Sequence, residues 1–368
     1  MRRARTWVST MDGYGGAPSV RRAHAGSGRP VAPPRPLLRE EREQLEATLL
    51  SGGATRAEGA GCRAAAEEPD PVRTCFERDR DRILHGPAFR RLAGKTQVFV
   101  FPDDHQRTRL THAIEVAQVA TSIAATLRLN VALTEAIALG HDCGHGPGGH
   151  ASEDAFSPYL PGGYDHAVWG ADVVLAPLNL CAETLDGIRN HSWSRPVPST
   201  PEGEVVSWAD RIAYVCHDFE DALHAGVVGA DALPAEVRAR CGDRRSAWLQ
   251  TFIDGVVAGT TATGAVGMVE PLADCLAEFR RTNYELIYNR PASVAQARTV
   301  VRVLSALVEH YVERPERLPH PPGYDEDPVR TAVAHVAGMT DRYAFETAVE
   351  LLDWSTAQLP RGFDSPRG

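Results

Sequence analysis

Apolar residues recur at three- and four-residue steps along most of the chain, and this spacing predicts helices. The clearest case is residues 111–129, where Val116, Val119 and Ile123 lie on one stripe. Residues 204–225 repeat the pattern over a longer stretch. Alternating apolar and polar positions never extend beyond a few residues, so the sequence predicts an all-α fold.

Shorter segments with the same spacing predict the remaining helices, and turn-forming residues separate them. The sequence contains no internal repeat, and residues 315–327 form a proline-rich connection. In chain order, these helical segments are residues 39–50, 69–99, 131–139, 167–175, 248–257, 268–288, 293–311 and, as one or two helices, 329–354.

The N-terminal residues differ from the rest in composition. Residues 1–36 are rich in Arg, Gly, Pro and Ala, and Asp12 is their only acid. The sequence therefore predicts a disordered basic arm, then a helical domain over residues 37–357 and a tail over residues 358–368. Such an arm could make weak contact with nucleic acid, although a solvated tail is the more common outcome of this composition.

The bulk composition excludes several classes of protein. The 368 residues are 43% hydrophobic, which suffices for a large core, and the net charge of -9 argues against general nucleic-acid binding. Seven cysteines are scattered without a Cys-x-x-Cys pair, as in reduced cytoplasmic proteins. No apolar run approaches the roughly 20 residues of a membrane span, so no membrane is expected.

Residues 139–153, LGHDCGHGPGGHASE, combine three histidines, two carboxylates and five glycines. His141 and Asp142 follow a predicted helix, where neighbouring side chains can bind one metal ion. Glycines let the chain turn tightly around such an ion. The alternative is a polar loop with solvated histidines. Three further polar residues are spaced to return to the same pocket, namely His145, His150 and Glu153.

The segment 204–225 carries a polar stripe as well as its apolar one. The stripe either faces solvent or borders a cleft, and its apolar and small neighbours favour the cleft. Its members follow helical spacing, and they are Asp210, Tyr214, His217, Asp218 and Asp221.

Asp210 extends the set of candidate metal ligands. With His112, in the first turn of its helix, and the His141–Asp142 pair, it provides two imidazoles and two carboxylates. This set suits a first-row transition ion with positions left for water. Such an ion lowers the pKa of water and so generates a nucleophile near neutral pH.

The order H…HD…D on helices resembles that of the HD-domain metal-dependent phosphohydrolases. The segments FERDRDRILHGPAFRRLAGKTQVF, RTRLTHAIEVAQVATSIA, EAIALGHDCGHGPGGHASE, VVSWADRIAYVCHDFEDAL and AGMTDRYA resemble, more closely, deoxyguanosinetriphosphate triphosphohydrolases and their dNTPase relatives. The resemblance extends from about residue 39 to residue 354. It implies an HD-domain helical fold with extra C-terminal helices.

The resemblance also implies roles for individual residues. It implies one divalent transition ion, with Mn, Fe, Zn, Ni and Co not distinguished, and a Mg ion could accompany the substrate phosphates. The implied metal ligands are His112, His141, Asp142 and Asp210. The implied catalytic residues are His150, its acidic partner Glu153, and His145.

The same resemblance implies how a nucleotide would be bound. His145 and His166 would hold the α-phosphate, Gln97 and Asp218 the sugar 3′-hydroxyl, Arg109 and Arg211 the phosphates, and Tyr214 would lie beside the sugar. Arg280 matches a phosphate-binding arginine, and Tyr288 matches a tyrosine that senses the 2′ position. A homo-oligomer is a further expectation.

The implied reaction fits these residue types. Water attacks the α-phosphorus, and the 5′-oxygen of the nucleoside leaves with a proton. A histidine suits that acid role because its pKa lies near neutrality, and Glu153 could hold the His150 ring in the required tautomer. The products would be a deoxynucleoside and triphosphate.

The central motif departs from the family pattern HDLGHPPFGH, and this leaves alternatives open. Cys143, Gly146 and Gly148 replace Leu, Pro and Phe, and residues 334–336 replace Asp-Tyr-Ile. The loss of the aromatic residue predicts a more open pocket. The first hypothesis is a dNTP triphosphohydrolase, and the second is a phosphohydrolase of a modified nucleotide or nucleoside monophosphate. The third, a catalytically dead nucleotide- or nucleic-acid-binding regulator, conflicts with the intact ligand set.

Overall fold

A computed structural model describes most of the chain, which divides into two compact units, Met1–Leu38 and Arg39–Gly368. In the smaller unit, β1 (Tyr14–Gly15) pairs antiparallel with β2 (Arg21–Arg22). The expected absence of regular structure before residue 37 was wrong for this ladder. The domain limits themselves stay predictions. The described residues are 7–8, 13–15, 20–27, 29, 31, 35–102, 105–318 and 327–360.

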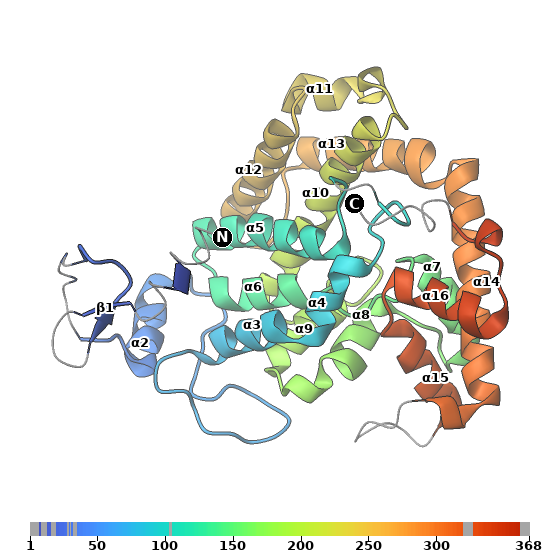
Figure 1. Cartoon of the computed structure of the whole chain (residues 1–368). Helices are drawn as coiled ribbons and strands as arrows, with labels where there is room; N and C mark the ends of the chain where they lie inside the picture. The colour runs from blue at the N-terminus through green and yellow to red at the C-terminus, as the bar shows by residue number, and fades with distance from the viewer. Residues whose placement is uncertain are drawn as a thin grey trace. The chain divides into compact units, whose positions relative to one another are not determined.

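The larger unit is built from helices (Figure 1). Its helices are α2 (Arg39–Leu49), α3 (Cys75–His85), α4 (Pro87–Arg91), α5 (Arg109–Leu127), α6 (Val131–Gly140), α7 (Ala151–Phe156), α8 (His166–Trp169), α9 (Ala182–Asn190), α10 (Pro201–His224), α11 (Ala235–Cys241), α12 (Arg245–Thr263), α13 (Glu270–Asn283), α14 (Pro291–Glu313), α15 (Pro328–Ala337) and α16 (Asp341–Leu352). The all-α prediction is confirmed, because the only strands among the described residues are β1 and β2.

Helix ends follow capping residues rather than the apolar stripe. α5 ends where Arg128 adopts a left-handed backbone with φ of 54°. α10 begins after Thr200, whose hydroxyl accepts a hydrogen bond from the N–H of Gly203, and Pro201 occupies its first position. α5 begins two residues and α10 three residues before the positions that the apolar stripe predicted.

The last predicted helical segment, residues 329–354, is two helices. α15 ends at Ala337 with Gly338 as its C-cap, and the Thr340 hydroxyl accepts from the N–H of Tyr343 to start α16. Two other predicted helices end in wider π-helical turns, Gly170–Val174 after α8 and Tyr284–Tyr288 after α13. Most of the predicted connection at residues 315–327 lies outside the described residues.

Two apolar cores hold the larger unit together. The first lies among α3, α5, α6, α9, α10, α12 and α13, and includes Ile123, Ile212 and Phe279. The second lies among α7, α14, α15 and α16, and includes Leu304 and Phe345. Full burial of each such side chain stabilises the fold by roughly 1.5–3 kcal/mol.

A polar contact joins the 141–150 segment to the C-terminal helices. Asp341, at the start of α16, accepts hydrogen bonds from the backbone N–H groups of Thr96 and Gly148 at 2.9 and 2.8 Å. Lys95 donates through Nζ to the carbonyl oxygens of His145 and, at 3.0 Å, Ala337. These bonds fix the loop that carries the candidate site. None of the helices in the described part of the chain is both long and apolar enough to span a membrane.

Candidate metal centre and active site

A cavity of about 570 Å³ in the larger unit is lined by residues that belong to both apolar cores and by polar residues between them. α5 and α10 contribute His112 and Asp210, the 141–153 segment contributes Asp142 and Glu153, and α14 contributes Val300. Fourteen of the fifteen site residues predicted from the sequence line it, and the fifteenth, His141, is buried behind them. Their roles stay predictions.

The four candidate metal ligands lie close together at one side of this cavity. Asp210 Oδ1 lies 3.1 Å from His112 Nε2 and 3.7 Å from His141 Nε2. Asp142 Oδ1 lies 3.5 Å from His141 Nε2, and Asp142 Oδ2 lies 3.9 Å from His112 Nε2. Ligand atoms at these separations could surround a single ion, and the nitrogen–carboxylate set fits a divalent transition metal.

A local hydrogen bond orients the ring of His141. His141 caps the C-terminus of α6, and its Nδ1–H donates to the carbonyl oxygen of Ala138 at 2.6 Å. This bond leaves the Nε2 lone pair directed into the cluster, where it has no hydrogen-bond partner. A buried nitrogen of this kind fits a metal ligand, because metal-bound histidines usually donate their other ring N–H.

The charges of the cluster stabilise one another. Burial opposes ionisation of Asp142, but Arg109 and the neighbouring histidines hold the pKa of that carboxyl well below its usual value. Burial likewise opposes the charge on His112, and the Asp210 carboxylate outweighs it and raises the pKa of that ring. The carboxyl groups of Asp142 and Asp210 are therefore both ionised and can bind a cation.

Arg109 lies within this charge network. Its Nη1 donates to Asp142 Oδ2 at 2.7 Å, and both side chains are almost fully buried. The sequence-based expectation was a phosphate-binding arginine. Its guanidinium lines the cavity and already pairs with a candidate metal ligand.

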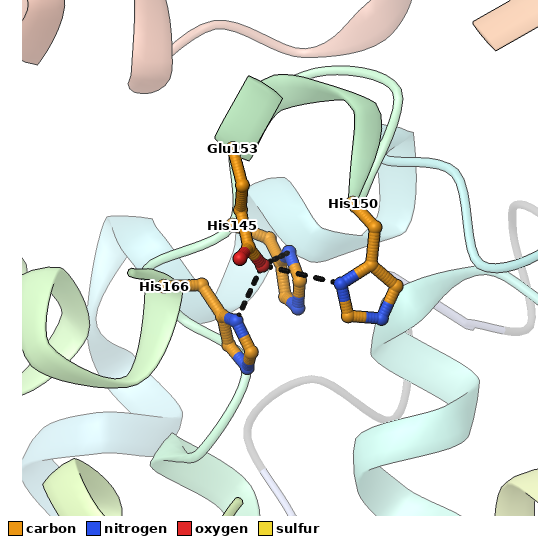
Figure 2. Close-up of side chains that lie close together, drawn as sticks. All are labelled: His145, His150, Glu153 and His166. Atoms are coloured by element: carbon orange, nitrogen blue, oxygen red, sulfur yellow. Dashed lines mark hydrogen bonds and ion pairs between the residues drawn. The ribbon is translucent and has the colours of Figure 1, made fainter. Parts of the chain in front are cut away.

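A second cluster lies beside the first and contains His145, His150, Glu153 and His166 (Figure 2). Glu153 Oε1 is its centre, at 3.1 Å from His150 Nδ1, 2.7 Å from His166 Nδ1 and 3.9 Å from His145 Nδ1. The His145 and His166 rings stack with centroids 3.7 Å apart. His150 is the exposed member, with 74% of its side chain accessible.

Residues implied in substrate binding line another wall. Asp218 accepts a hydrogen bond from the hydroxyl of Tyr288, and Arg280 Nε donates to the hydroxyl of Tyr214 at 2.6 Å. Arg211 stacks on the ring of Trp193, with 3.3 Å from its Cζ atom to the ring centroid. Trp193 also lines the cavity, and sequence reasoning did not single it out.

Two buried acceptor atoms on this wall have no hydrogen-bond partner. They are Asp218 Oδ1 and Gln97 Oε1. Both residues line the cavity, so a ligand hydroxyl could satisfy either atom.

His191 is the residue of the cluster that sequence reasoning missed. It caps the C-terminus of α9, as His141 caps α6, and its Nδ1–H donates to the carbonyl oxygen of Ile188 at 2.8 Å. Burial lowers the pKa of His191 to about 4, so the ring is neutral near pH 7. The sequence predicted a loop at residues 188–191, whereas α9 extends to Asn190, so no local signal marked His191 as the residue that follows a helix.

Gly148 does not open the pocket as the sequence suggested. A Cβ atom there would lie 2.4 Å from Val300 Cγ1, and the residue has φ of +72°. The side chain of Val300, on α14, therefore occupies the space that a larger residue would need. The expected enlargement of the pocket wall at this position was wrong.

The family comparisons agree with this geometry. The HD domain model matches residues 109–215, and the phosphohydrolase-associated domain model matches residues 266–350. HD domains bind divalent metals, and this chain carries a histidine–aspartate cluster that could hold one. The helical fold and this cluster define an HD-domain phosphohydrolase, a hydrolase enzyme.

Curated relatives make the assignment narrower. A deoxyguanosinetriphosphate triphosphohydrolase-like protein of Caldanaerobacter subterraneus subsp. tengcongensis is 40% identical over 319 residues, covering 83% of this chain and 93% of the relative. A protein of the same description from Clostridium perfringens is 38% identical over 324 residues, with 83% and 95% covered. The chain belongs to the family of deoxyguanosinetriphosphate triphosphohydrolase-like proteins.

The Asp218 carboxyl gives a prediction for the dependence of stability on pH. Burial raises its pKa to about 7, whereas an aspartate in an unfolded chain titrates near pH 4. Between these values the folded protein keeps a proton that the unfolded chain has lost. The free energy of unfolding therefore falls as the pH rises from about 4 to about 7.

We expect Asp218→Asn to remove this dependence. The free energy of unfolding of the variant, relative to that of the parent chain, should rise by on the order of 4 kcal/mol between pH 4 and pH 8. Urea unfolding of the metal-free protein at a series of pH values measures this gain. The control is Asp254→Asn, an exposed carboxylate on α12, and identical slopes for all three proteins would contradict the prediction.

Proposed function

We propose that this chain hydrolyses deoxynucleoside triphosphates to a deoxynucleoside and triphosphate. The observation that carries the proposal is that His112, Asp142 and Asp210, with His141 buried behind them, line the same cavity as the His150–Glu153 pair. The cavity volume, about 570 Å³, falls within the range typical of small-molecule sites. The description of both relatives as deoxyguanosinetriphosphate triphosphohydrolase-like supports a nucleoside triphosphate as the substrate.

Each wall of the cavity has a task in this reaction. A divalent ion held by the four ligands would polarise phosphoryl oxygens and make water more acidic. Arg211 and Arg280 face the cavity with charges that can offset those of a triphosphate. Asp218 and Gln97 offer unpaired acceptor atoms to a sugar hydroxyl.

His150 suits the role of general acid. It lies at the exposed rim of the cavity, and Glu153 holds its Nδ1 at 3.1 Å, so Nε2 is free to approach the leaving 5′-oxygen. His145 is less suited to this role, because burial lowers the pKa of its ring well below the usual value and leaves the ring without a proton to donate near neutral pH. Assembly into a homo-oligomer, contact of the N-terminal arm with nucleic acid and a cytoplasmic location stay predictions.

Asp210→Ala should remove the ion and abolish hydrolysis, because it deletes a carboxylate within 3.7 Å of both His112 and His141. The fold should survive, since Asp210 contributes no apolar side chain to either core. Elemental analysis and circular dichroism measure the two outcomes. Glu204→Ala, on the same helix, is the matched control, and full metal occupancy in Asp210→Ala would refute the assignment.

His150→Ala should keep the metal and lower kcat by about 10²–10⁴, the usual effect of losing a positioned acid. Steady-state turnover with a dNTP and metal content are the two measurements. His85→Ala replaces an exposed histidine that does not line the cavity, and should change neither. Near-normal turnover in His150→Ala would exclude this residue as the acid and leave His145 as the candidate.

The sugar hydroxyl provides the third test. A 2′,3′-dideoxynucleotide leaves Asp218 Oδ1 and Gln97 Oε1 unpaired, and each unpaired buried group costs about 1–3 kcal/mol. We therefore expect kcat/KM for the dideoxy form to be at least roughly tenfold below that of the dNTP. Gln97→Ala should narrow the difference. Equal values for the two nucleotides in the parent chain would remove both residues from sugar recognition.

The ribonucleotide serves as the comparison for the 2′ position. Tyr288 lines the cavity beside Asp218 and could exclude a 2′-hydroxyl by its bulk. A ribo form that equals or exceeds the deoxy form would favour the alternative hypothesis of a modified nucleotide or monophosphate. It would leave the proposed metal chemistry unchanged.

A further inference from the structure

The carboxylate of Asp341 holds two separate segments that line the cavity. Asp341 is the first residue of α16, and 3% of its surface is exposed. Its Oδ1 atom accepts a hydrogen bond from the backbone N–H of Gly148 at 2.8 Å. Its Oδ2 atom accepts from the backbone N–H of Thr96 at 2.9 Å and also from the Thr96 hydroxyl. Each oxygen therefore binds a different part of the cavity wall.

The Oδ1 contact lies just before the candidate general acid. Gly148 precedes His150 by two residues, and Gly148 and Gly149 have φ of +72° and +64°. Glycine populates positive and negative φ about equally well, so these two residues do not by themselves fix the direction of the chain. A hydrogen bond to a buried carboxylate supplies the restraint that they lack.

The Oδ2 contacts hold the residue before Gln97. Gln97 Oε1 is the buried acceptor to which the proposed function assigns the sugar hydroxyl. α16 also holds the other end of this segment, because the Phe101 ring packs edge-on against that of Phe345 with centroids 5.5 Å apart. The segment 96–101 is therefore anchored to α16 at both ends.

The chain passes very close to the start of α16 just before Thr96. A Cβ atom on Gly94 would lie 2.8 Å from Thr340 Cγ2. Lys95 Nζ donates to the carbonyl oxygen of Ala337, at the end of α15, at 3.0 Å. These contacts leave Thr96 little freedom to move without α16.

We propose that Asp341 is a positioning residue that acts on two sites together. Through Gly148 it places His150 for proton transfer, and through Thr96 it places Gln97 for the sugar hydroxyl. The inference rests on the proposed function, in which both placed residues have their roles. Asp341 does not itself line the cavity, so it acts through the backbone. One carboxylate thereby connects recognition of the sugar to the chemical step.

The deoxy/dideoxy ratio separates positioning from a general loss of structure. This ratio is kcat/KM for a dNTP divided by kcat/KM for its 2′,3′-dideoxy form. A partly unfolded variant has a lower apparent kcat because fewer molecules are active, but the active fraction cancels from the ratio. A changed ratio therefore reports on the sugar site of folded molecules.

Asp341→Ala removes both sets of contacts. We expect kcat to fall by up to about 10²-fold, as when a reacting group is misplaced by an ångström. The deoxy/dideoxy ratio should fall from at least roughly tenfold until the two nucleotides are equivalent. Asp327→Ala is the matched control, because Asp327 also starts a helix and accepts from the N–H of Val329 at 2.9 Å, but does not line the cavity. The control should change neither value.

Asp341→Asn separates the two contacts. Its single carboxamide oxygen can keep both donors of Thr96, and its NH₂ group then faces the N–H of Gly148, where two donors repel each other. We expect this variant to lose kcat and to keep the deoxy/dideoxy ratio of the parent chain. Because the amide has nearly the shape of the carboxylate, the variant also tests the proposal if Asp341→Ala does not fold.

Amide hydrogen exchange of the full-length protein gives a readout that needs no turnover. Peptides covering residues 95–101 and residues 144–150 should both exchange faster in Asp341→Ala than in the parent chain, and peptides of α12 should not. A parent chain that hydrolyses no dNTP would refute the proposed function. The exchange rates alone then decide whether Asp341 positions the two segments.

Three results would overturn the proposal. An unchanged deoxy/dideoxy ratio in Asp341→Ala would leave Asp341 with a structural role alone. Faster exchange in one of the two segments without the other would show that Asp341 does not connect them. A kcat in Asp341→Asn equal to that of the parent chain would show that the Gly148 contact does not place His150.

Discussion

A carboxylate with almost no exposure is stable in a protein interior only where positive or hydrogen-bonding groups surround it. Asp142 is such a group, and Arg109 donates to one of its oxygens while the rings of His141 and His145 approach the other. His112 approaches from α5. The buried carboxylate of Asp142, which follows α6, therefore needs the side chains of α5 beside it. The charges that pair these two helices are also the charges of the candidate metal centre.

The backbone after Asp142 has to pass unusually close to α8 to build this arrangement. A Cβ atom on Gly144 would lie 2.0 Å from the carbonyl oxygen of His166 and 2.4 Å from the nitrogen of Gly170. Only glycine fits there. The close passage allows the His145 ring to stack on the His166 ring, so a residue without a side chain sets the distance between two histidines of the candidate site.

Local sequence patterns predicted most of the helices, though not α7, α9 and α11, and most of the candidate cluster, because adjacency and helical period are local properties. The His141–Asp142 pair and the spacing of Asp210 on its helix are of this kind. His191 was missed because its significance depends on its distance from His166, which no local pattern encodes. The error at Gly148 has the same cause, since Val300 lies far along the chain. The two π-helical turns were missed because one extra residue per turn hardly disturbs an apolar stripe.

α6 and α9 both end at this cluster, where the rings of their capping residues His141 and His191 lie 4.9 Å apart. The C-terminus of a helix carries a partial negative charge, equivalent to about half an elementary charge. Two helix dipoles thus converge with their negative ends, next to two ionised carboxylates. A cation bound there would therefore be stabilised by the two helix ends as well as by the carboxylates.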